Sequence, residues 1–185
     1  NNASSQLEIS GAGTLNKATV SANLSTGITI SESSAITTLT LGASSPVLIA
    51  SGKTLSGSVS IDSGGTLKLT QTGTLASSVI LNGGILDIDE SLSSSGAYTL
   101  SAGSTIDIAN TKTLTYSGAG LTLGARTLTV SGAGALANSD TLTLDNADSV
   151  LKITGTNTVS GAVALNAGKL DIDESTTVSG ALTLG

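Results

Sequence analysis

The chain has 185 residues and a formal net charge of −6, and it contains no histidine, cysteine, methionine, tryptophan or phenylalanine. The excess of acidic residues and the presence of a single arginine, Arg126, argue against the basic face that nucleic-acid binding requires. The absence of histidine and cysteine excludes a zinc site built from these residues and any catalytic triad that uses histidine as its base.

No segment is apolar enough to span a bilayer, because the longest uninterrupted apolar run, at residues 47–50, has about four residues. Serine and glycine are poor helix formers, whereas threonine, valine and isoleucine suit pleated strands. The sequence begins without methionine or a signal-peptide pattern, so we expect a mature chain or a piece of a longer one. A core without aromatic packing must be narrow and regular enough for aliphatic side chains alone.

A three-part pattern repeats along the chain, and its first element is a pair of apolar residues separated by one residue. Such alternation is typical of a strand whose successive side chains point to opposite faces. Successive pairs lie 19–23 residues apart. The pairs are Leu7/Ile9, Ile28/Ile30, Val47/Ile49, Leu67/Leu69, Leu86/Ile88, Ile106/Ile108, Leu128/Val130, Leu151/Ile153 and Leu170/Ile172.

The second and third elements follow in each repeat, separated by turn residues such as glycine, serine, asparagine and aspartate. The second is usually one apolar residue: Leu15, Ile36, Leu55, Leu75, Leu92, Leu114, Leu136, Val159 and Val178. The third is again a pair: Leu39/Leu41, Val59/Ile61, Val79/Leu81, Tyr98/Leu100, Leu121/Leu123, Leu142/Leu144, Val163/Leu165 and Leu182/Leu184. The first repeat departs from this pattern near Val20 and Leu24, so its third element is left unassigned.

Strands this short bury little by themselves and become stable when like units stack. We therefore predict an all-β parallel β-helix, or β-solenoid, of about nine coils of 19–23 residues with three short strands per coil. The single repeat domain would span 1–185 and belong to a longer array or filament. A β-sandwich is the alternative, but it has no reason to repeat one three-part phrase.

Acidic residues gather after two of the first-element strands, where the sequence LDIDE occurs twice. Such clusters can bind Ca²⁺, which prefers several oxygen ligands. The candidates are Asp87, Asp89, Glu90, Asp171, Asp173 and Glu174. The alternative is a set of solvated acids that keep the rod soluble. We expect no other cofactor.

Small uncharged residues flank the second element and predict a flat strip along the rod. The strip is a candidate packing face for another rod or a flat partner, and its hydroxyl residues are Thr14, Thr37, Thr54, Ser56, Thr74, Ser91, Ser93, Thr113, Thr115, Thr158, Ser160, Thr177 and Ser179. The alternative explanation is β-propensity combined with a tight bend.

Two sharper functions compete with a structural role. Catalysis on a β-helix needs clustered carboxylates or basic groups in a groove walled by long loops, and units of nearly constant length leave no room for such loops. We therefore predict that the chain is not an enzyme. Ice binding would need sustained Thr-x-Thr arrays, and residues 38–40, 127–129 and 141–143 have that form without a matching series in neighbouring coils.

The phrases GGTLKLTQTGTL, GGILDIDE, AGKLDIDE and SGALTLG resemble the degenerate repeats of large bacterial surface proteins. The resemblance is to autotransporter passenger β-helices and filamentous-haemagglutinin-like exoproteins. It implies a right-handed coil, export to the cell surface or beyond, and a role in adhesion, biofilm or fibre formation. We further expect self-association, head-to-tail or lateral, or further repeats of the same chain, with a glycan or cell surface as a possible target.

Overall fold

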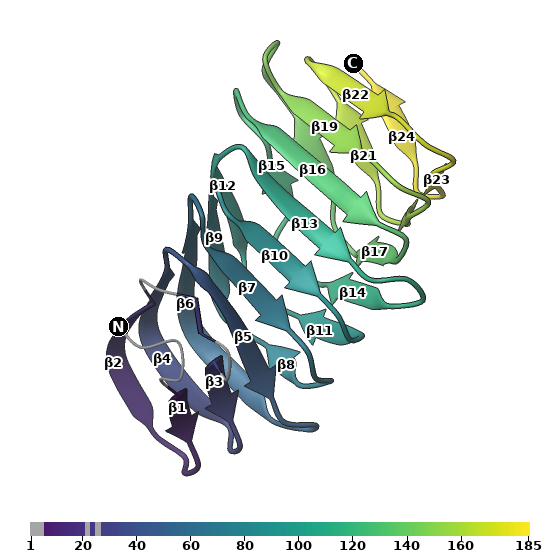
Figure 1. Cartoon of the computed structure of the whole chain (residues 1–185). Helices are drawn as coiled ribbons and strands as arrows, with labels where there is room; N and C mark the ends of the chain where they lie inside the picture. The colour runs from purple at the N-terminus through teal and green to yellow at the C-terminus, as the bar shows by residue number, and fades with distance from the viewer. Residues whose placement is uncertain (1–5, 21–22, 25–26) are drawn as a thin grey trace.

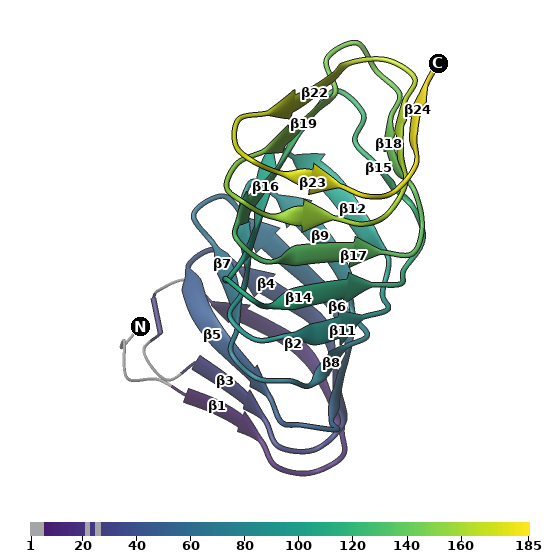
Figure 2. The same cartoon turned by 90° about the vertical axis from the view of Figure 1, so that its right-hand side faces the viewer.

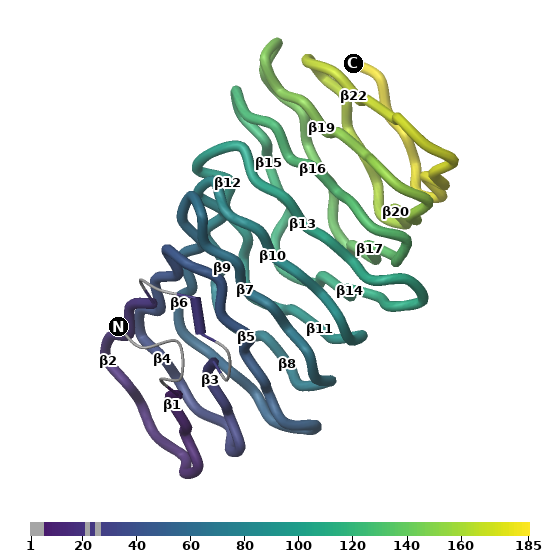
Figure 3. The backbone as a smooth tube through the Cα atoms, viewed as in Figure 1, coloured from purple at the N-terminus to yellow at the C-terminus, as the bar shows by residue number. Residues whose placement is uncertain are grey.

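The structure, a computed structural model, describes residues 6–20, 23–24 and 27–185, and it contains strands, turns and bends but no helix in these ranges. The chain winds as a stack of coils in which every ladder between named strands is parallel (Figures 1 and 3). Each coil has three sides, called here the first, second and third side after the order of the sequence elements. The predicted β-solenoid is therefore confirmed.

The first side is a nine-stranded sheet, and its strands follow the chain in order. They are β1 (Gln6–Ile9), β3 (Gly27–Ile30), β5 (Ser44–Ile49), β7 (Thr66–Leu69), β10 (Ile85–Ile88), β13 (Ser104–Ile108), β16 (Thr127–Gly132), β19 (Val150–Ile153) and β22 (Lys169–Ile172).

The second side runs the full length of the stack, and its first three strands turn the corner and form the beginning of the third side as well. It comprises β2 (Thr14–Val20), β4 (Ser34–Leu41), β6 (Thr54–Asp62), β8 (Thr74–Leu75), β11 (Leu92–Ser94), β14 (Thr113–Tyr116), β17 (Ala135–Asn138), β20 (Thr158–Val159) and β23 (Thr177–Val178). The third side continues through β9 (Ser78–Asn82) and β12 (Tyr98–Ala102), and then through a separate sheet of β15 (Leu121–Thr122), β18 (Leu142–Leu144), β21 (Val163–Leu165) and β24 (Leu182–Leu184).

The coil is right-handed. In Figure 1 the first side faces the viewer, and Figure 2 shows the second side after a quarter turn. In both views the strands on the near side run from left to right, and the chain then turns away from the viewer as it rises from the N-terminal to the C-terminal coil. This is the sense of a right-handed screw. This agrees with the handedness that the resemblance implies.

Equivalent aliphatic side chains stack inside the coil, each upon its counterpart in the next turn. Leu86 is the ladder partner of Ile106, and Leu151 is the partner of Leu170, as the repeat predicts. The first repeat also acquires a third side, because Val20 of β2 pairs with Leu41 of β4. Adjoining strands lie about 4.8 Å apart, so each turn is stabilised by main-chain hydrogen bonds and apolar contacts with both neighbouring turns.

The register slips by two residues at four steps, and there the predicted columns are wrong. On the first side Ser45 lies beside Leu67, and Ser104 beside Leu128. On the second side the same exchange places Ser34 beside Leu55 and Ser94 beside Leu75. A two-residue slip keeps every side chain on its own face. It also leaves one inward position without the expected aliphatic residue, and at each of the four steps a buried serine occupies that position.

Candidate functional site

Ion pairs cross-link successive coils on the outer face of the first side. Lys68 in β7 is the ladder partner of Asp87 in β10, and its ammonium nitrogen lies 2.9 Å from the Asp87 carboxylate and 2.6 Å from that of Asp89. A second pair links the same region to the following coil, because the Lys112 ammonium lies 2.7 Å from the Glu90 carboxylate. Each of these pairs joins residues that are one turn of the solenoid apart.

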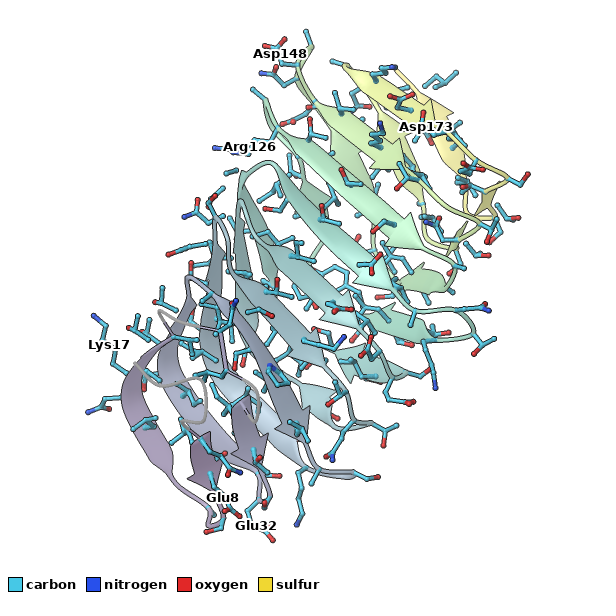
Figure 4. All side chains as sticks on the ribbon, viewed as in Figure 1. Glu8, Lys17, Glu32, Arg126, Asp148 and Asp173 are labelled. Carbon is cyan, nitrogen blue, oxygen red and sulfur yellow. The ribbon has the colours of Figure 1, made fainter. Side chains whose placement is uncertain are left out.

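The arrangement recurs 84 residues further along, where the sequence LDIDE is repeated. Lys152 in β19 is the ladder partner of Asp171 in β22, and its ammonium lies 2.9 Å from the carboxylate of Asp173. Asp171 contacts Lys169 of its own strand at 2.9 Å. In both places a lysine on the preceding coil stands opposite the Asp-x-Asp pair, so the sequence repeat is also a repeat of the ion-pair geometry (Asp173 is labelled in Figure 4).

The carboxylate of Asp87 is crowded by other acids. Burial raises its pKa above the ordinary 3.8; Lys68 opposes this shift, while Asp89 and Asp107 reinforce it. Asp107 is the ladder partner of Asp87 on the following coil, so two like charges are stacked there. Hydrogen bonds with Asp89 and Asp87 raise the pKa of Lys68 above 10.5. Both carboxylates therefore stabilise the charged form of Lys68, whereas burial and the neighbouring acids disfavour the ionised form of Asp87.

The six calcium candidates lie in two groups that are four strands apart along the first side. Five of them contact a lysine, and Glu174, in the exposed turn after β22, has no ion pair within the described ranges. Across the residues that the structure describes, no group of three or more acidic side chains gathers closely enough to hold a metal ion. Calcium binding stays a prediction, and the contacts that these acids make are with lysine.

The predicted Ser/Thr strip follows the second side, but the register slip divides it into offset columns. One column runs through Thr54, Thr74, Ser93 and Thr115. The slip sets Ser93, rather than Ser91, beside Thr74. Beyond it, the other flanking positions stack as Thr113, Ala135, Thr158 and Thr177, and near the N-terminal end as Thr14, Ala35 and Ser56. Thr37 is exposed in β4, and Ser179 is exposed just after β23.

Part of the hydrogen-bonding capacity of this strip is used within the rod. The Ser56 hydroxyl donates to the Ser34 carbonyl oxygen at 3.3 Å, and the Ser91 hydroxyl accepts from the amide of Thr113 at 3.0 Å. The Ser160 hydroxyl also approaches a carbonyl of the preceding coil at 3.5 Å. These contacts tie neighbouring coils together and leave mainly the threonine hydroxyls, such as that of Thr115, directed outward.

The three Thr-x-Thr segments do not form one array. Residues 127 and 129 lie in β16 on the first side. Residues 38 and 40 of β4 and residue 143 of β18 flank apolar residues of the third side, but the ladder from Thr40 continues through Ser60 and Ile80, so these threonines do not lie on consecutive coils. On the first side Thr129 stands between Thr105 and Lys152, so a charged side chain ends that threonine row.

The third side contains a feature that the repeat pattern does not predict. β12 is the last strand of one sheet and β15 the first of another, so main-chain pairing stops between them although the first and second sides continue past this point. We call this gap, between Tyr98–Ala102 and Leu121–Thr122, the seam. The surface there is hollowed to about 410 Å³, lined by Tyr98, Thr99, Leu100, Ser101, Gly120, Thr122, Gly124 and Arg126.

Side chains take the place of the main chain at both ends of the seam. At one end the amide of Tyr98 donates to the Tyr116 hydroxyl at 3.1 Å, and this hydroxyl in turn donates to the carbonyl of Ala119. At the other end the Arg126 Nε donates to the Ser101 carbonyl at 2.8 Å. In the preceding coil the equivalent amide, that of Val79, donates to a main-chain carbonyl, so Tyr116 substitutes for a ladder bond.

Both tyrosines lie within the core beside the seam. Their ring centroids are 4.4 Å apart, and the planes are tilted by 39°. The buried Tyr98 hydroxyl donates to Ser94 at 2.9 Å. Burial raises the pKa of both phenols, so the hydroxyls remain neutral donors well above physiological pH.

The signal for the seam was present in the sequence. The chain has two tyrosines and one arginine, and all three meet at this single interruption in the described ladders. The step from Tyr98 to Leu121 is also longer than most, at 23 residues. Rare residue types and an irregular step mark the place, but the partners lie on different coils and do not follow from spacing.

The described residues include no helix with the length and apolar character needed to cross a bilayer. No protein-family model, curated protein or solved structure matches this chain.

Proposed function

We propose that the chain is a non-catalytic structural rod of a secreted bacterial surface protein, which holds other parts of an adhesin, biofilm or fibre at a distance from the cell. The observation that carries this proposal is the uninterrupted parallel ladder of the first side, which joins nine coils over aliphatic columns buried on every turn between β3 and β19. Every coil adds about 4.8 Å, so the described stack is roughly 40 Å long.

The arrangement supports stiffness for two reasons. Bending the rod would stretch main-chain hydrogen bonds on one side, and those bonds are shared by consecutive coils rather than confined to one. It would also separate side chains such as Leu67, Leu86 and Ile106, which are fully or almost fully buried by their neighbours. Ion pairs such as Lys68 with Asp89 add cross-links at the surface, each of modest value because the side chains are partly exposed.

Export and cell-surface location are supported by the sequence resemblance alone. Self-association is a further expectation of this proposal, and the residues at which it can be tested are Ile172, Leu182 and Leu184 of the last described coil, which are 46%, 49% and 70% exposed. Their counterparts one coil earlier, such as Ile153 and Val163, are buried by the coil that follows. A further coil, from the same chain or from another copy, would cover them in the same way.

Negative-stain electron microscopy and small-angle scattering test the structural role. We expect straight rods of constant cross-section, and fibres or paired rods in addition if copies associate. A compact particle, or one that bends throughout its length, would contradict the rod. Sedimentation of a Leu182→Lys, Leu184→Lys variant beside the unchanged chain then separates association through the last coil from lateral association.

A polysaccharide-binding module is the second candidate, and the hydroxyl column of the second side favours it. Thr54, Thr74, Ser93 and Thr115 repeat at the ladder spacing and form a straight row of donors and acceptors. Replacing Thr74 and Thr115 by valine keeps the shape and β-propensity while removing hydroxyls. Loss of retention on immobilised polysaccharides by this variant would support binding, and unchanged retention, or none by either protein, would contradict it.

A further inference from the structure

We propose that the seam between β12 and β15 is a hinge of the rod: the third side opens there while the first and second sides stay paired, with Tyr116 and Arg126 as its two latches. The inference goes beyond the proposed structural role, because it concerns where a rod of this construction yields. It rests on the interrupted ladder and on the side-chain hydrogen bonds across the seam, and it does not depend on what the rod supports.

The seam is the weakest interface of the described stack, because coils of a solenoid are held by nearest-neighbour contacts. At other steps all three sides contribute a parallel ladder, whereas at this step β10 pairs with β13 and β11 pairs with β14, but β12 has no strand partner on the next coil. Regions with fewer main-chain bonds and more exposed ones open at lower free energy than the rest of a protein.

The amides that face the seam can be identified from the alternation along each strand. The Tyr98 amide points to Tyr116 across the seam, so the amide of Leu100, two residues on, faces the same way. The amides of Leu121 and Leu123 donate to Thr141 and Thr143 on the following coil, so that of Thr122 points back toward the seam. No strand pairs with β12 and β15 on the sides where Leu100 and Thr122 direct these amides.

The two latches sit at opposite ends of the opening. The Tyr116 phenol accepts from the amide of Tyr98 and donates to the carbonyl of Ala119, and so links the start of β12 to the segment just before β15 from inside the core. Arg126 lies at the rim (Figure 4), in the turn before β16, and its side chain reaches back to Ser101. Opening breaks these side-chain bonds but no strand ladder, and the continuous first and second sides then act as the fold line.

Hydrogen exchange followed residue by residue tests the latches. Tyr116→Phe keeps the ring and removes the bridging hydroxyl, and we expect the amide of Tyr98, which donates to that hydroxyl, to exchange faster by roughly fivefold to thirtyfold, while Ile106 and Leu136 are unchanged. Tyr98→Phe is the matched control, because its hydroxyl bonds to Ser94 and not across the seam. Equal acceleration by both variants, or a uniform increase along the rod, would overturn the proposal.

Arg126→Ala, at the other end of the seam, should also accelerate exchange of the Tyr98 amide, with Lys17→Ala, which removes an exposed positive charge from β2, as the control. Opening itself is measured by spin labels, which the absence of cysteine allows at engineered positions. Labels at Thr99 and Thr122 straddle the seam, and labels at Thr122 and Thr143 occupy ladder partners across an ordinary step. Dipolar spectroscopy should give a broader distance distribution for the Thr99/Thr122 pair than for the Thr122/Thr143 pair, and Tyr116→Phe should broaden it further. Equal widths for both pairs would contradict a hinge.

Discussion

Ser45 of β5 lies directly beside Leu67 of β7 in the first-side ladder, and its side chain is completely buried. The hydroxyl donates to the carbonyl of Pro46 at 3.3 Å, so a polar group occupies the aliphatic column without being left unpaired. The residue fills an inward position in a coil whose register has moved by two residues relative to the next. Its small volume is therefore part of how the slip is accommodated.

We expect Ser45→Leu to destabilise the protein even though leucine is the commonest residue of the columns. The position is closed on all sides, and inserting a larger side chain into a packed core costs about 1–3 kcal/mol. Ser45→Ala, which keeps the volume and loses one weak hydrogen bond, should change the unfolding free energy by less than about 1 kcal/mol. Chemical denaturation measures both, and a Ser45→Leu protein as stable as the parent would show that the core is not closed there.

Leu86→Ala should be among the most damaging single truncations. Leu86 stands between Leu67 and Ile106 and is fully buried, so the loss leaves a cavity in the middle of a column, with an expected cost of about 2–5 kcal/mol. Thr105→Ala, one residue before Ile106 on the outer face, is the control and should cost far less. Native-state hydrogen exchange should also place the lost protection in the coils beside β10; an even loss along the rod would argue against nearest-neighbour stabilisation.

Substitutions at two glycines distinguish the free-energy cost of backbone strain from that of steric overlap. Gly57 and Gly52 both have positive φ, at 112° and 72°. A Cβ added to Gly57 would lie 1.9 Å from the Ile36 carbonyl oxygen of the preceding coil, whereas one added to Gly52 meets nothing within 4 Å. Gly52→Ala should cost about 1–2 kcal/mol from conformation alone. Gly57→Ala should cost clearly more, because one of the two coils must also move; similar denaturation midpoints would refute the close approach.

The charged ladder predicts an unusual pH dependence. Because the folded pKa of Asp87 is raised above 3.8, its contribution to stability is fully present at pH below 3.8 and is lost as pH rises through the folded value. Asp87→Asn should therefore be as stable as the parent, or more stable, at neutral pH, with a difference of about 1 kcal/mol or less at this partly exposed site. The balance should shift toward the parent as pH falls below that range. Urea denaturation across pH 3 to 7 measures the trend, and Lys68→Met should steepen it by removing the opposing charge.

The solenoid could be predicted because its two periods are properties of the sequence. Alternation of apolar residues, as in Leu86 and Ile88, defines strands, and the return of that alternation after about 20 residues defines a coil whose short strands need neighbours. The lysine opposite each Asp-x-Asp pair also follows once the register is known, since Lys68 and Asp87 occupy the same place in consecutive repeats. An interpretation of the acids alone, without the preceding coil, does not identify their lysine partners.

The register slips and the seam were decided by packing in three dimensions. A shift of two residues leaves every side chain on its original face, so the apolar alternation does not show whether Ser94 or Leu92 is the partner of Leu75. Only the volume available in the core distinguishes the two registers. The meeting of Tyr116, Tyr98 and Arg126 joins residues from different coils. The amino-acid order thus determines that this chain coils, which faces are apolar and how long each turn is, because these depend on local alternation. Where consecutive turns settle against each other, and where one side parts, depends on side-chain volumes and hydrogen-bond partners that become neighbours only in the folded stack.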